Sequence, residues 1–235
     1  MKTCIITGAG SGIGRSTAID LSNRDIFDTL VIIGKNEKNL DDTYESMNKE
    51  KNIKKIVYDL VDLEGVPNLV ADIYKECNSI DCLLNIAGFA DPQPLLNTTL
   101  YNMQYTYSIN VFAPFMLIRE CVKYMKNNKN GAKILNVAST AGSTPRPGWL
   151  SYSSSKASLI SMSQTLSEEL SEYNIKVYCI SPGRCATALR KKLAPEEDPT
   201  SIMQPEDVSK IICNLVSDTE CCLDGQNIVI RRKTN

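Results

Sequence analysis

The sequence predicts an α/β protein in which helices cover both faces of a doubly wound parallel sheet, giving three layers, α/β/α. Short apolar runs rich in β-branched residues alternate with longer stretches of helical periodicity along most of the 235 residues. This alternation indicates βαβ units, which run their strands in parallel. A glycine-rich loop follows the first apolar run directly, and no linker or repeat interrupts the chain. One domain, residues 1–235, is therefore expected.

The expected elements follow one another in a regular order. About seven strands are expected, at residues 3–7, 29–33, 53–58, 80–87, 132–138, 175–180 and 226–231. The helices expected between them lie near residues 13–23, 37–50, 65–78, 99–127, 149–172 and 205–217. In the 149–172 segment, Leu150, Ala157, Ile160 and Leu166 recur at helical spacing.

Composition and charge argue against several classes of partner. A hydrophobic fraction of 43% and a charged fraction of 23% are those of an ordinary globular protein. A net charge of −1 offers no electrostatic reason to expect a nucleic acid or an anionic membrane as partner. The longest apolar runs, such as residues 30–33, are far too short to span a bilayer, and glycines end the first run before a signal-peptide core could form. A cytoplasmic protein is expected.

The nine cysteines do not form a metal-binding or disulfide pattern. Their number is odd, they are scattered, and the chain has neither a CxxC pair nor a single histidine, so no metal site is expected. Structural thiols in a reducing cytoplasm are the favoured interpretation. The adjacent Cys221 and Cys222 could instead be redox-active, although no neighbouring basic residue is present to lower the pKa of either thiol.

The first expected strand leads straight into the loop TGAGSGIG (7–14) and then a helix. Gly8, Gly12 and Gly14 allow a tight turn, close approach of backbone N–H groups to a diphosphate, and helix packing. A P-loop is the competing phosphate-binding motif. It is disfavoured because Ala9 stands where its first glycine belongs and Arg15 replaces the lysine that contacts the β- and γ-phosphates.

The end of the second expected strand bears on the choice of cofactor. A carboxylate here would bind the ribose 2′-OH of NAD, whereas a basic residue would bind the 2′-phosphate of NADP. This chain has Gly34 and Lys35 and no carboxylate, which favours NADP(H) over NAD(H). The other interpretation of Lys35 is a solvent-exposed lysine after a strand.

The pentapeptide YSSSK (152–156) is a candidate proton-transfer pair in a chain without histidine. Lowering the pKa of a tyrosine from about 10 to about 7 takes roughly 4 kcal/mol. One ammonium about 4 Å away supplies about that much at an effective dielectric of about 20. Positions i and i+4 share a helix face, so Tyr152 and Lys156 can act together. A Tyr/Lys stripe on a solvated helix is the alternative for the pentapeptide taken alone.

Six motifs in order make the chain similar, over nearly its whole length, to the short-chain dehydrogenase/reductase family. They are TGAGSGIG (7–14), NIAG (85–88), Asn110, Ser139, YSSSK (152–156) and SPGRCAT (181–187). Ser139 precedes Tyr152 by 13 residues, as in the family. The resemblance implies a Rossmann-type fold, a small-molecule carbonyl or alcohol substrate, and a homodimer or homotetramer.

The resemblance also implies roles for four catalytic residues. Tyr152 would be the general acid for carbonyl reduction and the base for alcohol oxidation. Lys156 would lower the pKa of Tyr152 and bind the nicotinamide ribose. Ser139 would hold the substrate oxygen, and Asn110 would position Lys156 through a water. Singly, Ser139 could be a loop hydroxyl, Asn110 a helix-interior polar residue and Gly183 part of a turn.

The cofactor site follows from the same resemblance. The residues predicted to bind the cofactor are Gly8, Ser11, Gly12, Ile13, Gly14, Lys35, Asn36, Asp59, Leu60, Asn85, Ala87, Gly88, Tyr152, Lys156, Pro182, Gly183 and Thr187. Among them, Asp59 resembles the residue that contacts the adenine.

Three departures from the family pattern bear on substrate and assembly. Ile86 replaces the usual second asparagine, the substrate lid around 188–204 is short and highly charged, and the chain ends at IVIRRKTN without an Asp-Gly-Gly extension. The last strand and any C-terminal subunit contact are therefore in doubt.

The substrate-facing candidates are Phe89, Ala141, Ser143, residues 145–149 and the lid. The basic residues Arg184, Arg190, Lys191 and Lys192 could meet an anionic substrate such as an acyl-carrier-protein thioester, but a solvated basic stretch is favoured because charge runs are usually exposed.

The function expected from the sequence is that of an NADP(H)-dependent oxidoreductase acting on CH–OH and C=O groups. The alternative is a cofactor-sensing protein with the same fold and little turnover, which would not need the complete Ser/Tyr/Lys/Asn set. An oligomeric scaffold would leave the glycine loop unexplained.

Overall fold

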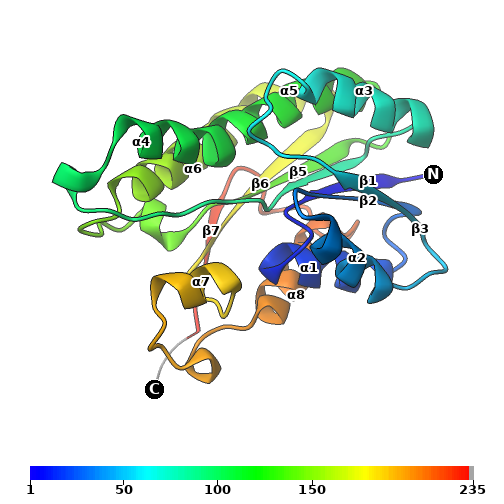
Figure 1. The fold of residues 1–235 in the computed structure, drawn as a ribbon. Coiled ribbons are helices and arrows are strands. Elements are labelled where there is room, and N and C mark those ends of the chain that lie inside the picture. Colours follow the sequence, from blue (N-terminus) through cyan, green and yellow to red (C-terminus); the bar gives the residue numbers. More distant parts are fainter. Residues whose placement is uncertain (233–235) are drawn as a thin grey trace.

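A computed structural model describes residues 1–232 and contains a seven-stranded parallel sheet in the order β3-β2-β1-β4-β5-β6-β7 (Figure 1). The strands are β1 (Thr3–Thr7), β2 (Thr29–Gly34), β3 (Asn52–Val57), β4 (Cys82–Asn85), β5 (Ala132–Val137), β6 (Ile175–Pro182) and β7 (Asn227–Ile230). The predicted fold class is confirmed. The last strand, which the sequence left in doubt, is present and pairs with β6 over four residues, Cys179–Pro182 against Asn227–Ile230.

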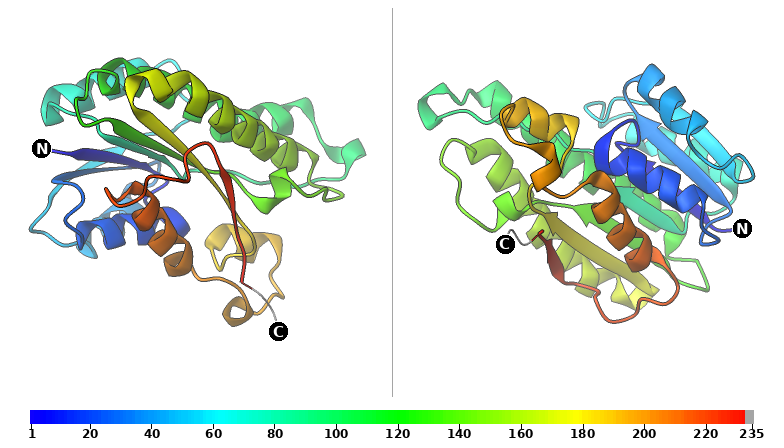
Figure 2. Two further views of the ribbon diagram at one scale, coloured as in Figure 1. Left: turned by 180° about the vertical axis from the view of Figure 1, so that it is seen from behind. Right: turned by 90° about the horizontal axis from the view of Figure 1, so that it is seen from below.

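Helices cover both faces of the sheet, as Figures 1 and 2 show. They are α1 (Gly12–Ser22), α2 (Glu37–Glu45), α3 (Val66–Cys77), α4 (Leu100–Tyr107), α5 (Ala113–Met125), α6 (Leu150–Leu170), α7 (Ala188–Leu193) and α8 (Pro205–Val216). Buried side chains of α1, α2 and α8 form one core with the sheet, and those of α3, α5 and α6 form a second core on the opposite face. Successive residues of central strands such as β1 and β2 alternate between these cores, so both faces of the sheet centre are dry.

The strand order reverses between β1 and β4, and this reversal determines where a ligand can bind. β1 pairs with β2 on one side and with β4 on the other, and Ile5 lies opposite both Val31 and Leu83. Connections therefore leave the carboxyl ends of β1 and β4 in opposite directions. In open α/β sheets a crevice forms at this topological switch point.

The segment predicted as one helix over 99–127 is divided by a π-helical segment. Between α4 and α5, residues Ser108–Phe112 adopt i to i+5 spacing. Pro114 lies in the first turn of α5 and has no N–H to donate, which favours a change of spacing at this point. Other boundaries differ by a few residues: α2 ends at Glu45, and β4 covers only the middle of the predicted 80–87 run.

The predicted lid around 188–204 contains α7 and a short 3₁₀ turn at Pro199–Ser201. Its base is closed by a β-bridge between Cys185 and Met203, with the Ala186 N–H donating to the Met203 carbonyl at 2.8 Å. Glu197 accepts hydrogen bonds from Arg190 Nε at 2.6 Å and from Arg184 Nη1 at 3.0 Å. Both ends of the segment are thus tied to the body of the protein, and its partly buried carboxylate, Glu197, joins two arginines.

All nine cysteines are free, and seven of them are buried. Cys221 and Cys222 are exposed, with their Sγ atoms 3.5 Å apart. The hydrogen bond with Cys221 raises the pKa of Cys222, an effect that exceeds the opposing influence of Lys176. A raised pKa disfavours the reactive thiolate. Within residues 1–232, no helix combines the length and the apolarity needed to cross a membrane.

Candidate active site

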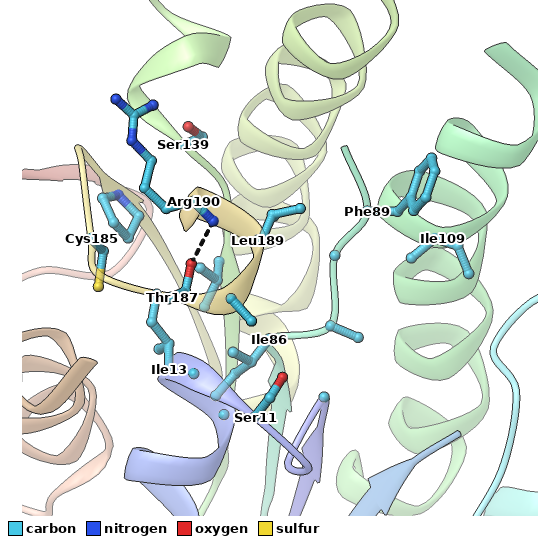
Figure 3. Close-up of a pocket in the computed structure, with 18 of the residues that line it drawn as sticks. Ser11, Ile13, Ile86, Phe89, Ile109, Ser139, Cys185, Thr187, Leu189 and Arg190 are labelled. Atoms are coloured by element: carbon cyan, nitrogen blue, oxygen red, sulfur yellow. Dashed lines mark hydrogen bonds between the residues drawn. The ribbon is translucent and has the colours of Figure 1, made fainter. Parts of the chain in front are cut away.

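A cavity of about 400 Å³ opens at the carboxyl ends of the strands and reaches from the glycine loop to α7 (Figure 3). Figure 3 shows Thr187, Leu189 and Arg190 of the lid region on one side and Phe89 and Ile109 on the other. Every residue predicted to bind the cofactor lines this cavity except Asn85. Of the four predicted catalytic residues, Ser139, Tyr152 and Lys156 line it and Asn110 does not.

The loop after β1 has the shape that a diphosphate requires. Gly8 and Gly12 adopt φ values of +68° and +52°, and a Cβ on Gly14 would lie 2.2 Å from the Gly8 carbonyl oxygen. The first N–H groups of α1 have no helical acceptor, and Ser11 makes no side-chain capping bond to them. These free donors at a helix N-terminus fit a dinucleotide phosphate.

Thr7 joins this loop to the NIAG segment. Its Oγ1 donates to the Leu84 carbonyl at 3.2 Å and accepts from the N–H groups of Ile86 and Ala87 at 3.0 and 3.2 Å. Ala87 consequently lies so close to Gly8 that a Cβ added there would be 2.8 Å from the Ala87 Cα. Thr7 is not among the predicted site residues, because a threonine at the end of a strand gives no indication in the sequence that it joins two loops.

Asn85 lies behind the cavity wall. Its side chain is 2% exposed, and Nδ2 donates to Asn136 Oδ1 at 2.9 Å. Asn136 in turn donates to Ser163 Oγ on α6, also at 2.9 Å. Asn85 therefore anchors β4 to β5 and indirectly to α6, and the NIAG backbone beyond it lines the cavity.

Asn110 fastens the NIAG segment to the helix that carries Tyr152. It is fully buried in the π-helical segment. Its Oδ1 accepts from the Phe89 N–H at 2.8 Å, while Nδ2 donates to the Phe89 carbonyl and to Ser155 Oγ, both at 2.9 Å. Ser155 donates in turn to the Tyr152 carbonyl at 2.7 Å. In this structure Asn110 is a positioning residue.

Lys156 is buried, and in this structure its ammonium bonds to a backbone carbonyl and not to the Tyr152 hydroxyl. Its Nζ donates to the Val137 carbonyl at 2.8 Å and lies 5.8 Å from the centroid of the Tyr152 ring. Burial lowers the pKa of Lys156 from 10.5 to about 8. The i, i+4 spacing does bring the two side chains to one cavity, but a buried carbonyl attracts the ammonium away from the phenol.

Burial also raises the pKa of Tyr152 above its ordinary value of 10. A hydrogen bond with the Ser139 side chain and the positive charge of Arg146 oppose this shift. Ser139 begins a 3₁₀ turn, where its Oγ accepts from the Ala141 N–H at 3.2 Å. Trp149 packs edge-on against Tyr152 with ring centroids 5.7 Å apart. Tyr152 thus stays protonated at neutral pH in the cofactor-free protein.

The basic residues near the lid differ in their surroundings. Arg184 and Arg190 both pair with Glu197, so each has a carboxylate partner and the three side chains together carry a net charge of +1. Lys191 and Lys192 are exposed on α7 and do not line the cavity. At the other end, Lys35 is exposed at the cavity rim beside Asn36, whose Oδ1 caps α2 by accepting from the Asn39 N–H at 2.9 Å.

Comparison with known proteins defines the class of this protein. The profile of the short chain dehydrogenase family matches residues 2–198. The chain belongs to that family, and it is an oxidoreductase with an NAD(P)-binding Rossmann fold.

Particular relatives cover almost the full chain. The 3-oxoacyl-(acyl-carrier-protein) reductase FabG of Thermotoga maritima is 29% identical over 97% of this chain and 96% of its own. A short chain dehydrogenase from Shigella flexneri, solved with NADP, is 27% identical over 97% and 96% of the two chains, with a TM-score of 0.89. A 4-hydroxyisoleucine dehydrogenase variant, solved with NADH and succinate, is 28% identical over the same shares, with a TM-score of 0.88.

Proposed function

We propose that this protein catalyses NADP(H)-dependent interconversion of a carbonyl and a hydroxyl group, with Tyr152 as the proton donor and acceptor. The observation that carries the proposal is the meeting of Ser139, Tyr152 and Lys156 in one cavity that is continuous with the glycine loop. Relatives solved with NADP and with NADH support a nicotinamide cofactor. A bound nicotinamide supplies hydride transfer at the carbonyl carbon.

Ser139, Tyr152 and Lys156 transfer the proton and stabilise the charge that develops during the reaction. In the direction of reduction, Ser139 donates a hydrogen bond to the carbonyl oxygen, and Tyr152 transfers its phenolic proton to that oxygen. Lys156, with a pKa of about 8, is mostly charged at neutral pH and stabilises the phenolate left on Tyr152. Oxidation of an alcohol uses the same groups in reverse. Asn110 holds the helix of Tyr152 in register with the NIAG segment.

Residues of the glycine loop and of the strand ends would hold the cofactor. Gly8, Gly12 and Gly14 leave room for the diphosphate, and Ala87 and Gly88 line the cavity between the loop and Lys156. Asp59 and Leu60, after β3, are suited to the adenine, and Pro182, Gly183 and Thr187 to the nicotinamide end. Residues 188–204 would act as the substrate lid of a single domain.

We also propose a homo-oligomeric assembly and a cytoplasmic location. Large apolar side chains are exposed on α4, at the end of the π-helical segment and in the first turn of α5: Leu100 and Tyr101 at 72% and 73%, and Phe112 and Phe115 at 45% each. Exposed apolar side chains of this size suit a homodimer or homotetramer. Seven buried free thiols suit a reducing cytoplasm.

A panel of carbonyl compounds tests whether the protein catalyses a reduction. Consumption of NADPH and of NADH is measured with ketones, aldehydes, quinones and 3-oxoacyl thioesters. We expect at least one carbonyl class to be reduced, with NADPH preferred. If NADPH binds, as detected by its fluorescence, but no carbonyl on the panel is reduced and no alcohol is oxidised, the enzymatic proposal is wrong and a cofactor-sensing role takes its place.

Lys35 is expected to determine the preference for NADPH over NADH. In Lys35→Glu, a carboxylate replaces the cation expected to face the 2′-phosphate of NADP. We expect the KM for NADPH to rise about 10- to 100-fold, because a hydrogen bond between charged groups is worth roughly 1.5–3 kcal/mol, while the KM for NADH changes little. Lys38→Glu is the matched control, since Lys38 is exposed on α2 outside the cavity. An unchanged KM for NADPH in Lys35→Glu would remove Lys35 from the site.

A further inference from the structure

Arg146 lies on the substrate side of the cavity, between the turn that begins at Ser139 and the helix of Tyr152. Its Nη2 donates to Thr140 Oγ1 at 3.1 Å, and its guanidinium carbon lies 5.8 Å from the Trp149 ring centroid. Arg146, Thr140, Trp149 and Tyr152 all line the cavity. The guanidinium is therefore held in place by a hydroxyl and an indole ring beside the reacting groups.

The guanidinium of Arg146 lacks a carboxylate partner. None of the ion pairs formed within residues 1–232 includes Arg146. Its Nε is buried and has no hydrogen-bond acceptor. A buried charged donor without an acceptor is costly, and such groups are uncommon in native proteins. Arg184 and Arg190, at the lid end of the same cavity, both pair with Glu197. Arg146 is thus the arginine of this cavity that has no carboxylate partner among the described residues.

We propose that Arg146 binds a carboxylate of the substrate, so that the carbonyl substrates of this enzyme are oxo acids and its alcohol substrates are hydroxy acids. This inference rests on the proposed function and names its substrate class. The guanidinium lines the cavity with its charge unpaired by any residue that the structure describes, and its planar N–H groups match the geometry of a carboxylate. An ordinary 3-oxoacyl thioester, by contrast, brings no carboxylate to this position.

The surroundings of Arg146 limit where the reacting carbonyl lies. Thr140, which orients the guanidinium, directly follows Ser139, and the charge of Arg146 partly opposes the rise that burial causes in the pKa of Tyr152. The carboxylate and the carbonyl are therefore separated by only a few carbon atoms. Apolar side chains supply the remaining wall, with Phe89 packed edge-on against Tyr105 at 4.8 Å between ring centroids. This wall suits an apolar body on the oxo acid.

The test compares acids with neutral esters of the same carbon skeleton. NADPH oxidation is measured with 2-, 3-, 4- and 5-oxo acids, each paired with its methyl ester, for the wild type, Arg146→Met and Arg146→Lys. We expect the wild type to favour an acid over its ester. In Arg146→Met we expect kcat/KM for that acid to fall about 10- to 100-fold and kcat/KM for the ester to change less than about threefold. Arg146→Lys should recover part of the loss, because an ammonium keeps the charge but not the paired N–H groups.

A binding measurement separates this inference from the proposed function. Calorimetric titration of 4-oxopentanoate into Tyr152→Phe saturated with NADP should show binding. In the double variant Tyr152→Phe/Arg146→Met, the affinity for 4-oxopentanoate should be about 10- to 100-fold lower. Lys210→Met, on the exposed surface of α8, controls for loss of a charge elsewhere, and thermal melting reports whether each variant folds. If esters and acids are reduced equally well and Arg146→Met lowers both alike, the inference is wrong while the proposed function stands. If nothing is reduced but the acid binds through Arg146, the proposed function is wrong and the anion site stands.

Discussion

Tyr152→Phe is expected to lower the turnover number about a thousandfold or more while the affinity for NADPH changes less than about threefold. General acid–base catalysis by a positioned side chain contributes roughly 10²- to 10⁴-fold, and this chain has no histidine to replace the phenol. Burial keeps the phenol protonated at neutral pH, so the proton that the reduction consumes is present on Tyr152. Phenylalanine keeps the ring that packs against Trp149, and the cavity should retain its shape.

Turnover and cofactor binding are measured separately for this variant. Steady-state NADPH consumption gives the turnover number on the best substrate, and quenching of protein fluorescence gives the cofactor affinity. Tyr101→Phe is the matched control, because Tyr101 is 73% exposed and lies outside the cavity. Turnover close to that of the wild type in Tyr152→Phe would mean that another group delivers the proton. Parallel loss of NADPH binding would instead indicate a structural role for Tyr152.

Lys156→Met is expected to abolish most turnover and yet to stabilise the cofactor-free protein at neutral pH. Burial lowers the pKa of Lys156 from 10.5 to about 8, so the unfolded chain binds this proton more tightly than the folded one. A shift of that size corresponds to about 3 kcal/mol of destabilisation at pH 7. The variant loses the hydrogen bond to the Val137 carbonyl, which is worth about 1 kcal/mol. A net gain of about 1–2 kcal/mol in the free energy of unfolding follows.

The sign of the pH dependence distinguishes this explanation from a general packing effect. The destabilisation of the folded wild type by its buried, charged Lys156 is complete below pH 8. It is relieved as the pH rises from about 8 towards 10.5, because Lys156 loses its proton in the folded protein before it does in the unfolded chain. Urea unfolding at pH 7 and at pH 9.5 should therefore show a difference between variant and wild type that shrinks at the higher pH. Lys210→Met, on the protein surface, should show no such trend. A difference that grows with pH would contradict the assignment.

Much of the fold could be predicted because the central strands are largely apolar and buried and each helix is bounded by loop residues. A strand such as Val31–Ile33 must be buried on both faces, and only a parallel sheet between two helical layers provides such burial. The π-helical segment could not be predicted. It depends on Pro114 and on the bonds of Asn110 to Phe89 and Ser155, two residues that are distant from Asn110 in sequence.

The candidate site was predictable in position but not in its internal geometry. Motif order brought Ser139, Tyr152 and Lys156 to one cavity with the glycine loop. Helical spacing gave the direction of the Lys156 side chain but not the carbonyl of Val137 that its ammonium contacts. For Arg146, neither the burial of its Nε atom nor the lack of a carboxylate partner among the described residues can be read from the segment PRPGW. Charge compensation depends on residues that are neighbours only in the folded chain, as Glu197 shows for Arg184 and Arg190.

The lid segment has the properties of an exchangeable unit. Its ends are brought together by the Cys185–Met203 bridge, and its partly buried carboxylate, Glu197, pairs with Arg190 inside the segment and with Arg184 at its base. The helices and strands on either side therefore depend little on what the segment contains. Doubling the length of a loop between fixed ends costs only about 0.6 kcal/mol of closure entropy. Lids of other lengths and sequences can thus be grafted between Cys185 and Met203, which makes this stretch of chain the natural place for substrate range to diverge, in evolution or by design, without rebuilding the sheet.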